Sequence, residues 1–132
     1  MGAWGVGNFD NDTVLDWLYD LQEAEDISLI SKTIDAVFDE TYIDADVGAE
    51  ALGAIEAIAR LQGNFGVSTE YSEELNAWVK SHPLSVERIL KEKAKKALEL
   101  ILGEKSELHE LCEESDELDA WEKEVYTLKN RL

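Results

Sequence analysis

The sequence is poor in the residues that crosslink a chain and in the signals that send it to a membrane. Its one cysteine, Cys112, excludes a disulfide within the chain. No apolar run approaches the roughly 20 residues that a membrane helix needs, and no N-terminal stretch has the basic-then-apolar order of a secretion signal. We therefore expect a cytoplasmic protein that makes no membrane contact.

Strand and hairpin signals are also missing, and apolar residues recur at helical spacing instead. With 132 residues, the chain is long enough to bury one core. We predict an all-α fold, a compact single-domain bundle of six or seven helices that spans residues 1–132. Glycine, proline and capping residues place these helices at residues 12–23, 27–40, 46–62, 72–82, 85–102 and 106–132, with an interruption of the last near residue 114.

The segment 46–62 is apolar over more than half of a helical circumference, so we predict that it is the central buried helix. Gly48 and Gly53 weaken helix propensity there, a cost that is usually offset by the close approach of a neighbouring helix. Gly63 suits the position just after the helix end. The strip left over by the apolar residues is polar and consists of Glu50, Glu56 and Arg60.

The first ten residues hold two aromatic side chains that are too apolar for a free terminus. Glycines between them allow tight turns, so we predict that residues 1–10 form a lid packed on the core. The glycine spacing lacks the following lysine and the preceding strand of a phosphate-binding loop. The structural residues predicted here and in the first helix are Trp4, Gly5, Gly7, Phe9, Asn11 and Trp17.

The opening residues also resemble a known family. Met1 to Gly5, followed by Gly7, Phe9, Asn11-Asp12 and Asp16-Trp17, is similar to the N-terminal signature of small bacterial proteins classed as a domain of unknown function. Val14 stands where that signature favours a small residue such as alanine. The resemblance implies a bacterial, cytosolic domain with a shared N-terminal structure, and it supplies no catalytic residue.

Basic residues are scarce: 12 Lys and Arg stand against 30 Asp and Glu, which gives a net charge of -18. Residues 1–79 hold 17 acidic residues and two basic ones, whereas residues 80–96 have a net charge of +4 and residues 97–132 one of -7. A field of this sign repels phosphates, so it argues against a nucleic-acid partner and for a basic protein. The alternative is that the acidity serves solubility alone.

The acidic side chains of the first helix fall in a narrow arc opposite its leucines. We predict that this arc and the acidic residues between 39 and 50 contact a basic partner. The predicted partner-binding residues are Asp12, Asp16, Asp20, Glu23, Asp39, Glu40, Asp44, Asp46 and Glu50. The functional hypothesis is a monomeric, non-enzymatic protein-binding domain, most concretely an immunity or inhibitor protein that neutralises a basic bacterial toxin or nuclease.

An uncharacterised enzyme or metal-binding protein is a second hypothesis. His109, Cys112 and Glu113 share one helix face, where they could bind a metal or activate the thiol. A half-buried cysteine that fills space beside leucines is the simpler interpretation, and two strong ligands rarely hold a structural zinc. We therefore predict no metal, no cofactor and no catalytic residue. An acidic group at the start of the third helix could bind calcium weakly but lacks the order of an EF-hand loop; it comprises Asp44, Asp46 and Glu50.

The C-terminal segment, residues 106–132, suggests a third function. Its apolar heptad suits either a self-associating coil or a hairpin that packs on the domain, and we favour the hairpin. The heptad consists of Leu111, Leu118, Val125 and Leu132. Before this segment lies a run of lysines, which we expect to pair with acidic neighbours rather than bind a polyanion. These lysines are Lys91, Lys93, Lys95 and Lys96.

Overall fold

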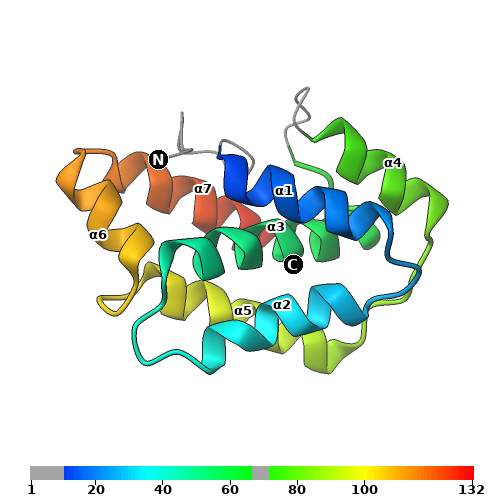
Figure 1. Ribbon diagram of the computed structural model, residues 1–132, viewed down its shortest axis with the longest axis horizontal. Helices are drawn as coiled ribbons and strands as arrows, with labels where there is room; N and C mark the ends of the chain where they lie inside the picture. Colours follow the sequence, from blue (N-terminus) through cyan, green and yellow to red (C-terminus); the bar gives the residue numbers. More distant parts are fainter. Residues whose placement is uncertain (1–10, 67–71) are drawn as a thin grey trace.

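A computed structural model describes residues 11–66 and 72–132, and within these ranges the protein has seven helices (Figure 1). The helices are α1 (Asp12–Gln22), α2 (Ser28–Phe38), α3 (Ala45–Leu61), α4 (Glu73–Ser81), α5 (Arg88–Leu102), α6 (Glu107–Glu114) and α7 (Leu118–Asn130). The predicted all-α bundle of six or seven helices is confirmed. The lid predicted for residues 1–10, which includes Trp4, Gly5, Gly7 and Phe9, lies outside the described residues.

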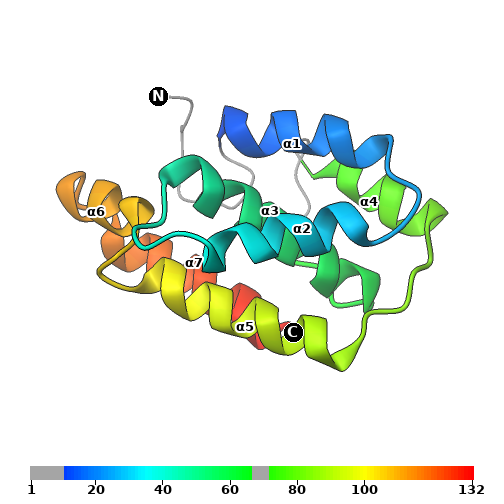
Figure 2. The same cartoon turned by 60° about the horizontal axis from the view of Figure 1, so that its bottom comes forward.

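α3 lies at the centre of the bundle and contacts every other helix that the structure describes. α1 and α3 run in the same direction, and α2 returns antiparallel to both (Figure 1). α1 and α4 cover one side of α3, while α5 and α7 cover the opposite side, as the second view shows (Figure 2). The prediction that the segment 46–62 forms the central helix is therefore confirmed.

Burial in α3 goes beyond its apolar residues. Glu56 and Arg60, two members of the predicted polar strip of this helix, are buried at 4% and 1% exposure. Glu50, the third member of that strip, is half-buried. The physical reason is that α4 and α7 pack over the end of α3, where the charged side chains bond to one another instead of to water.

Two glycines of α3 allow neighbouring helices to approach its backbone. A Cβ atom on Gly53 would clash with Cγ2 of Val14 on α1, and one on Gly48 would lie 2.8 Å from Cδ1 of Leu108 on α6. Real Cβ atoms essentially never come so close to another heavy atom. The close approach that we predicted from these glycines is therefore confirmed at both positions.

Helix ends carry the expected capping residues at two places. Oδ1 of Asn11 accepts a hydrogen bond of 2.9 Å from the N–H of Val14 and so caps α1. After α3, Gly63 adopts a φ of 89°, and the N–H of Asn64 donates to the carbonyl of Ala59 at 2.9 Å. This left-handed glycine and back-directed hydrogen bond end α3 in the way that the sequence predicts.

The start of α5 differs from the prediction. The helix predicted over residues 85–102 begins instead at Arg88, with Glu87 in the N-cap position. Residues 82–87 have no helical structure, and Leu84 and Val86 pack against the core from this segment. These two partly buried side chains reach the core from a non-helical segment, so the helix starts at Arg88 rather than at residue 85.

α6 and α7 form a hairpin that packs on α5. Trp121, Val125 and Leu128 of α7 are buried inside the single chain, at 4%, 0% and 0% exposure. The other members of the predicted heptad are half-buried; they are Leu111, Leu118 and Leu132. The apolar side of α7 is therefore covered within one chain.

Candidate partner-binding site

α1 and the start of α3 carry six acidic residues on adjacent helices, which we call the α1–α3 acidic face. They are Asp12, Asp16, Asp20, Asp44, Asp46 and Glu50. Five of them are exposed, and Glu50 is half-buried. α1 buries its apolar side, which includes Leu18 and Leu21, so its aspartates at i, i+4 and i+8 project into solvent.

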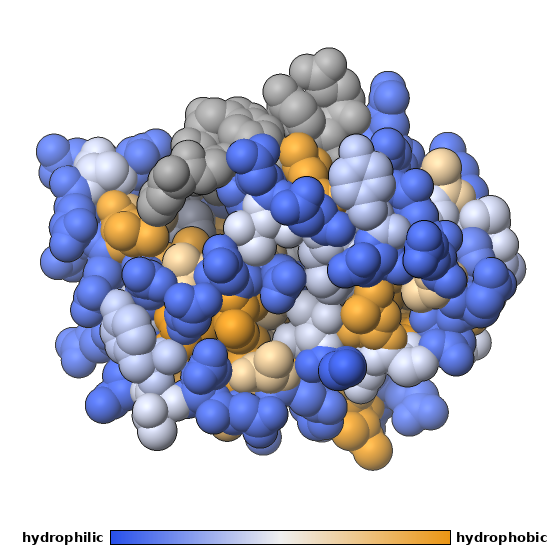
Figure 3. All heavy atoms as spheres, viewed as in Figure 1, coloured by the Kyte–Doolittle hydropathy of each residue, from blue (hydrophilic) through white to orange (hydrophobic). Residues whose placement is uncertain are grey.

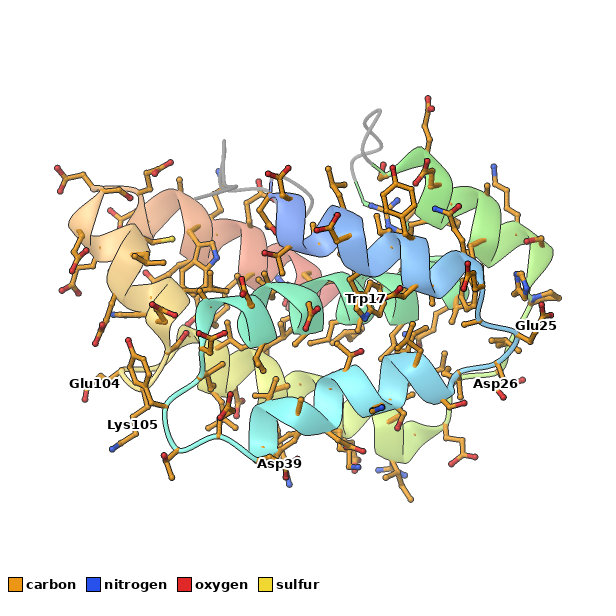
Figure 4. All side chains as sticks on the ribbon, viewed as in Figure 1. Trp17, Glu25, Asp26, Asp39, Glu104 and Lys105 are labelled. Carbon is orange, nitrogen blue, oxygen red and sulfur yellow. The ribbon has the colours of Figure 1, made fainter. Side chains whose placement is uncertain are left out.

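Trp17 fixes the orientation of α1. Its side chain is 3% exposed, and Nε1–H donates a hydrogen bond of 2.9 Å to Oγ1 of Thr33 on α2. The Thr33 hydroxyl in turn donates to the carbonyl of Leu29 at 2.7 Å. Figure 4 shows Trp17 in the space between α1 and α2. Because this anchor resists rotation of α1, the aspartates keep their outward direction.

Carboxylates also satisfy the first N–H groups of α3. Oδ2 of Asp44 accepts from the N–H of Asp46 at 3.1 Å, and Oε1 of Glu107 accepts from the N–H of Ala45 at 2.8 Å. The hydroxyl of Thr13 on α1 donates to Oδ1 of Asp46 at 3.0 Å, which joins the two helices. Negative charge at this helix start is also favoured by the helix dipole.

Glu50 lies where the acidic residues of α1 meet those at the start of α3. Burial raises the pKa of the Glu50 carboxyl, and the negative charges of Asp46, Asp20 and Asp44 raise it further. The Glu50 carboxylate is therefore close enough to these three aspartates to be repelled by them. A basic group that binds among them would relieve this repulsion.

The α1–α3 acidic face makes no ion pair within residues 11–66 and 72–132, although the same ranges contain five Lys or Arg ion pairs and two His–Glu contacts elsewhere. The molecular face that includes α1, α2 and the start of α3 is mostly hydrophilic, with apolar side chains in separate small groups (Figure 3). The acidic groups are thus accessible to a partner.

Three of the predicted partner-binding residues lie elsewhere. Glu23 is the C-cap of α1, at the end opposite Asp12. Asp39 and Glu40 follow α2, and Figure 4 shows Asp39 at the end of α2 far from Asp26. Asp39 lines a shallow hollow of about 670 Å³ along the outer side of α2. The structure therefore divides the predicted surface into the α1–α3 acidic face and a separate α2 surface.

His109, Cys112 and Glu113 lie on α6, where Cys112 packs against the hydrophobic core. Nδ1 of His109 lies 2.9 Å from the carbonyl oxygen of Leu102, and its Nε2 lies 3.5 Å from Oε2 of Glu113. Burial, aided by the charge of Glu117, raises the pKa of the Cys112 thiol to about 11. At neutral pH the thiol is therefore protonated and a weak nucleophile.

Residues 11–66 and 72–132 contain no group of three or more His, Cys, Asp or Glu side chains that could hold a metal ion, and this includes the acidic residues at the start of α3. Among the helices of these ranges, none combines the length and apolar composition that crossing a bilayer requires.

A buried ionic cluster at the end of α3 was not predicted from the sequence. Oε1 of Glu56 lies 3.3 Å from Nε of Arg60, and its Oε2 lies 2.7 Å from Nη2 of Arg131 after α7. Nη1 of Arg60 donates to Oδ1 of Asn76 on α4 at 2.5 Å, and Arg131 also donates to the carbonyl of Asn64 at 3.3 Å. An i, i+4 pair of opposite charges within an apolar helix was the signal that could have revealed it. The cluster ties α4 and the end of α7 to α3.

The lysines of α5 only partly follow their prediction. Nζ of Lys93 lies 2.6 Å from Oδ1 of Asp35 on α2, which is the expected pairing with an acidic neighbour. Lys91, Lys95 and Lys96 make no ion pair with a residue that the structure describes. The prediction therefore holds for Lys93 and is wrong for the other three lysines.

Replacing Glu50 by glutamine is expected to stabilise the free protein by a few tenths of a kcal/mol at neutral pH, because it removes a like-charge pair with Asp46 at i, i+4. The folded-state pKa of Glu50 lies above its ordinary value of 4.5. Ionised Glu50 therefore lowers stability above the folded-state pKa, and the wild-type protein regains this stability as the pH falls toward 4.5. Urea unfolding at neutral and acidic pH measures the difference. Asp119→Asn on α7 is the control, and a variant less stable than wild type at neutral pH would contradict the repulsion.

Comparisons with known proteins give one match. The model of a family described as "Domain of unknown function (DUF4259)" matches residues 2–124 of the chain. No curated protein and no solved structure matches it.

Proposed function

Because the chain belongs to the DUF4259 family, whose description assigns no reaction, we propose a function from the site geometry. The protein is a non-enzymatic, acidic protein-binding domain that acts as a monomer in the bacterial cytoplasm. It binds a basic protein through the α1–α3 acidic face. In the most concrete form of the proposal it is an immunity or inhibitor protein, and the partner is a basic toxin such as a nuclease.

The observation that carries the proposal is the crowding of Asp20, Asp44, Asp46 and Glu50 with no basic residue paired to them among the described residues. Solubility alone requires dispersed charge and gains nothing from carboxylates that repel one another. A local arrangement that opposes stability is instead typical of a functional site.

A nuclease offers the matching chemistry. Its Lys and Arg side chains hold phosphates, and the same groups can bind carboxylates presented on a preformed helical surface. Opposite fields on the two proteins also accelerate their encounter, which is useful when a toxin must be neutralised before it acts. The net charge of -18 provides such a field.

The test compares three immobilised proteins: wild type, the variant D16N/D20N/D46N/E50Q and the control E114Q/D119N/E122Q/E124Q. The control changes the same number of charges on α6 and α7. Each immobilised protein is exposed to the lysate of a cell that makes a basic toxin, and the proteins that it retains are identified. The association rate of the retained protein is then measured at low and high salt.

We expect a basic protein that associates with wild type and with the control at similar rates. The acidic-face variant should associate roughly 10- to 100-fold more slowly, with a weaker dependence on salt. Equal association rates for all three proteins would overturn the assignment of this face. Capture of acidic proteins alone would overturn the proposed partner class.

A further inference from the structure

We propose that the exposed Tyr19 ring of α1 contacts an arginine side chain of the basic partner and makes this surface prefer arginine to lysine. The inference rests on the proposed function, because it takes a basic protein as the partner and names the side chain that the partner must present. The α1–α3 acidic face attracts any cation. The Tyr19 ring at its border distinguishes two cations of equal charge.

Tyr19 exposes more of its side chain than any other aromatic residue that the structure describes. It is 63% exposed, compared with 51% for Tyr126. Its side chain makes no hydrogen bond and no ring contact with a described residue. The ring is therefore accessible to a partner, and the fold does not depend on it.

Carboxylates lie on both sides of Tyr19. Asp16 at i−3 and Glu23 at i+4 are its neighbours on α1, and both are exposed. On the other side of Tyr19, Gln22 at i+3 donates a hydrogen bond of 2.8 Å from Nε2 to Oε2 of Glu74. Glu74 belongs to α4, which packs beside α1 (Figure 2). This hydrogen bond holds a third carboxylate on the side of α1 that carries the ring.

The carboxylates around Tyr19 have no cation of their own among the described residues, since none of the ion pairs there involves them. The chain has no Lys or Arg before Lys32, which lies on the outer side of α2. Lys80, the one basic residue of α4, follows Glu74 by six positions and therefore lies on a different side of that helix. The surroundings of the ring are thus complementary to a cation from a partner.

Two other exposed tyrosines in the described ranges have different surroundings. Tyr126 on α7 has lysines at i−3 and i+3 and a glutamate at i−4, so the charges beside its ring largely cancel. The Tyr42 hydroxyl already donates a hydrogen bond of 2.6 Å to Oε2 of Glu110. Of these three side chains, Tyr19 alone combines a ring without polar contacts and carboxylates on both sides.

A guanidinium group fits this arrangement better than an ammonium group. A planar guanidinium stacks on an aromatic ring and keeps its five N–H donors in its own plane, where they reach carboxylates beside the ring. Each carboxylate can accept two of these N–H groups in parallel. An ammonium group is a compact, strongly hydrated charge and gains less from the ring. The side chain that this surface selects is therefore arginine.

The experiment uses the full chain and two fluorescent synthetic peptides of equal length and charge. Every basic position is arginine in one peptide and lysine in the other, with glycine and serine between these positions. Fluorescence anisotropy at low salt, where screening is weak, measures the Kd of both peptides for each protein. The proteins are wild type, Y19L, Y19F, the control Y126L and D16N/D20N/D46N/E50Q. Circular dichroism checks that each variant is folded.

We expect wild type to bind the arginine peptide about 2- to 5-fold more tightly than the lysine peptide. Y19L should lose this preference because its affinity for the arginine peptide falls to that for the lysine peptide. Y19F keeps an aromatic ring and should retain the preference, and Y126L should behave as wild type does. The D16N/D20N/D46N/E50Q variant should bind both peptides more weakly, because it removes charge that attracts either cation.

Equal affinities of wild type for the two peptides would overturn the inference, and so would an arginine preference that Y19L retains. In both cases the proposed function stands if D16N/D20N/D46N/E50Q binds both peptides more weakly than wild type. Affinities that this variant leaves unchanged would instead count against the proposed function, whatever the effect of Y19L. The absence of saturable binding of either peptide up to about 1 mM would also overturn the inference.

Discussion

Replacing Glu56 by alanine is expected to lower the free energy of unfolding by about 3–5 kcal/mol, because it removes one member of a buried ionic cluster. Arg60 and Arg131 share the Glu56 carboxylate, at 3.3 and 2.7 Å. Without it, the buried Arg60 guanidinium and the half-buried Arg131 guanidinium lose the carboxylate that they share. Urea unfolding followed by circular dichroism measures the loss, and the melting temperature should fall by at least about 10 °C.

Two further variants make this result specific. Glu50→Ala changes the same residue type on the same helix, at a half-buried position that has no ion pair with a described residue, and it should alter stability by no more than about 0.5 kcal/mol. The double variant Glu56→Ala/Arg131→Met should be more stable than the sum of its single changes predicts, because it also removes a half-buried cation that Glu56→Ala leaves without its carboxylate. If Glu56→Ala unfolds at the same urea concentration as Glu50→Ala, the cluster does not stabilise the fold.

Replacing Trp121 by alanine is expected to cost about 3–5 kcal/mol, because it opens a large cavity in the core. Trp121 lies on α7, is 4% exposed and packs in the hydrophobic core of the bundle. Tyr126→Ala is the matched control on the same helix, since its ring is 51% exposed and its removal should have a small effect. Unfolding of both variants by urea gives the comparison.

Urea unfolding and light scattering at several protein concentrations test whether α7 mediates self-association. If α7 packs within one chain, the urea midpoint and the mass from light scattering should not depend on protein concentration, for wild type and for Trp121→Ala. A midpoint that rises with protein concentration would instead support the coil that the C-terminal heptad suggests.

Local patterns in the sequence predicted most of the fold. Helical periodicity placed the first helix at residues 12–23, and α1 spans Asp12–Gln22. Glycines were equally informative, because the close approach at Gly53 and the left-handed turn at Gly63 both follow from the absence of a side chain. Such features depend on neighbours in sequence or on one residue's own geometry.

Features that depend on distant residues were not predictable. The burial of Glu56 requires Arg131, which is 75 positions away, and nothing in the local sequence indicates that the two meet. The crowding of Asp20 with Glu50 likewise requires α1 and α3 to lie side by side. Sequence spacing could show that the carboxylates of α1 share an arc. It could not show which second helix would place further carboxylates beside them.

The central position of α3 determines how a partner would meet this protein. Half of the α1–α3 acidic face belongs to α3, a helix that every other described helix holds in place, and the other half is anchored by the Trp17 indole. Such a surface has its final shape before an encounter. Association would therefore order few groups, lose little conformational entropy and leave the backbone of the free and bound forms closely superimposable.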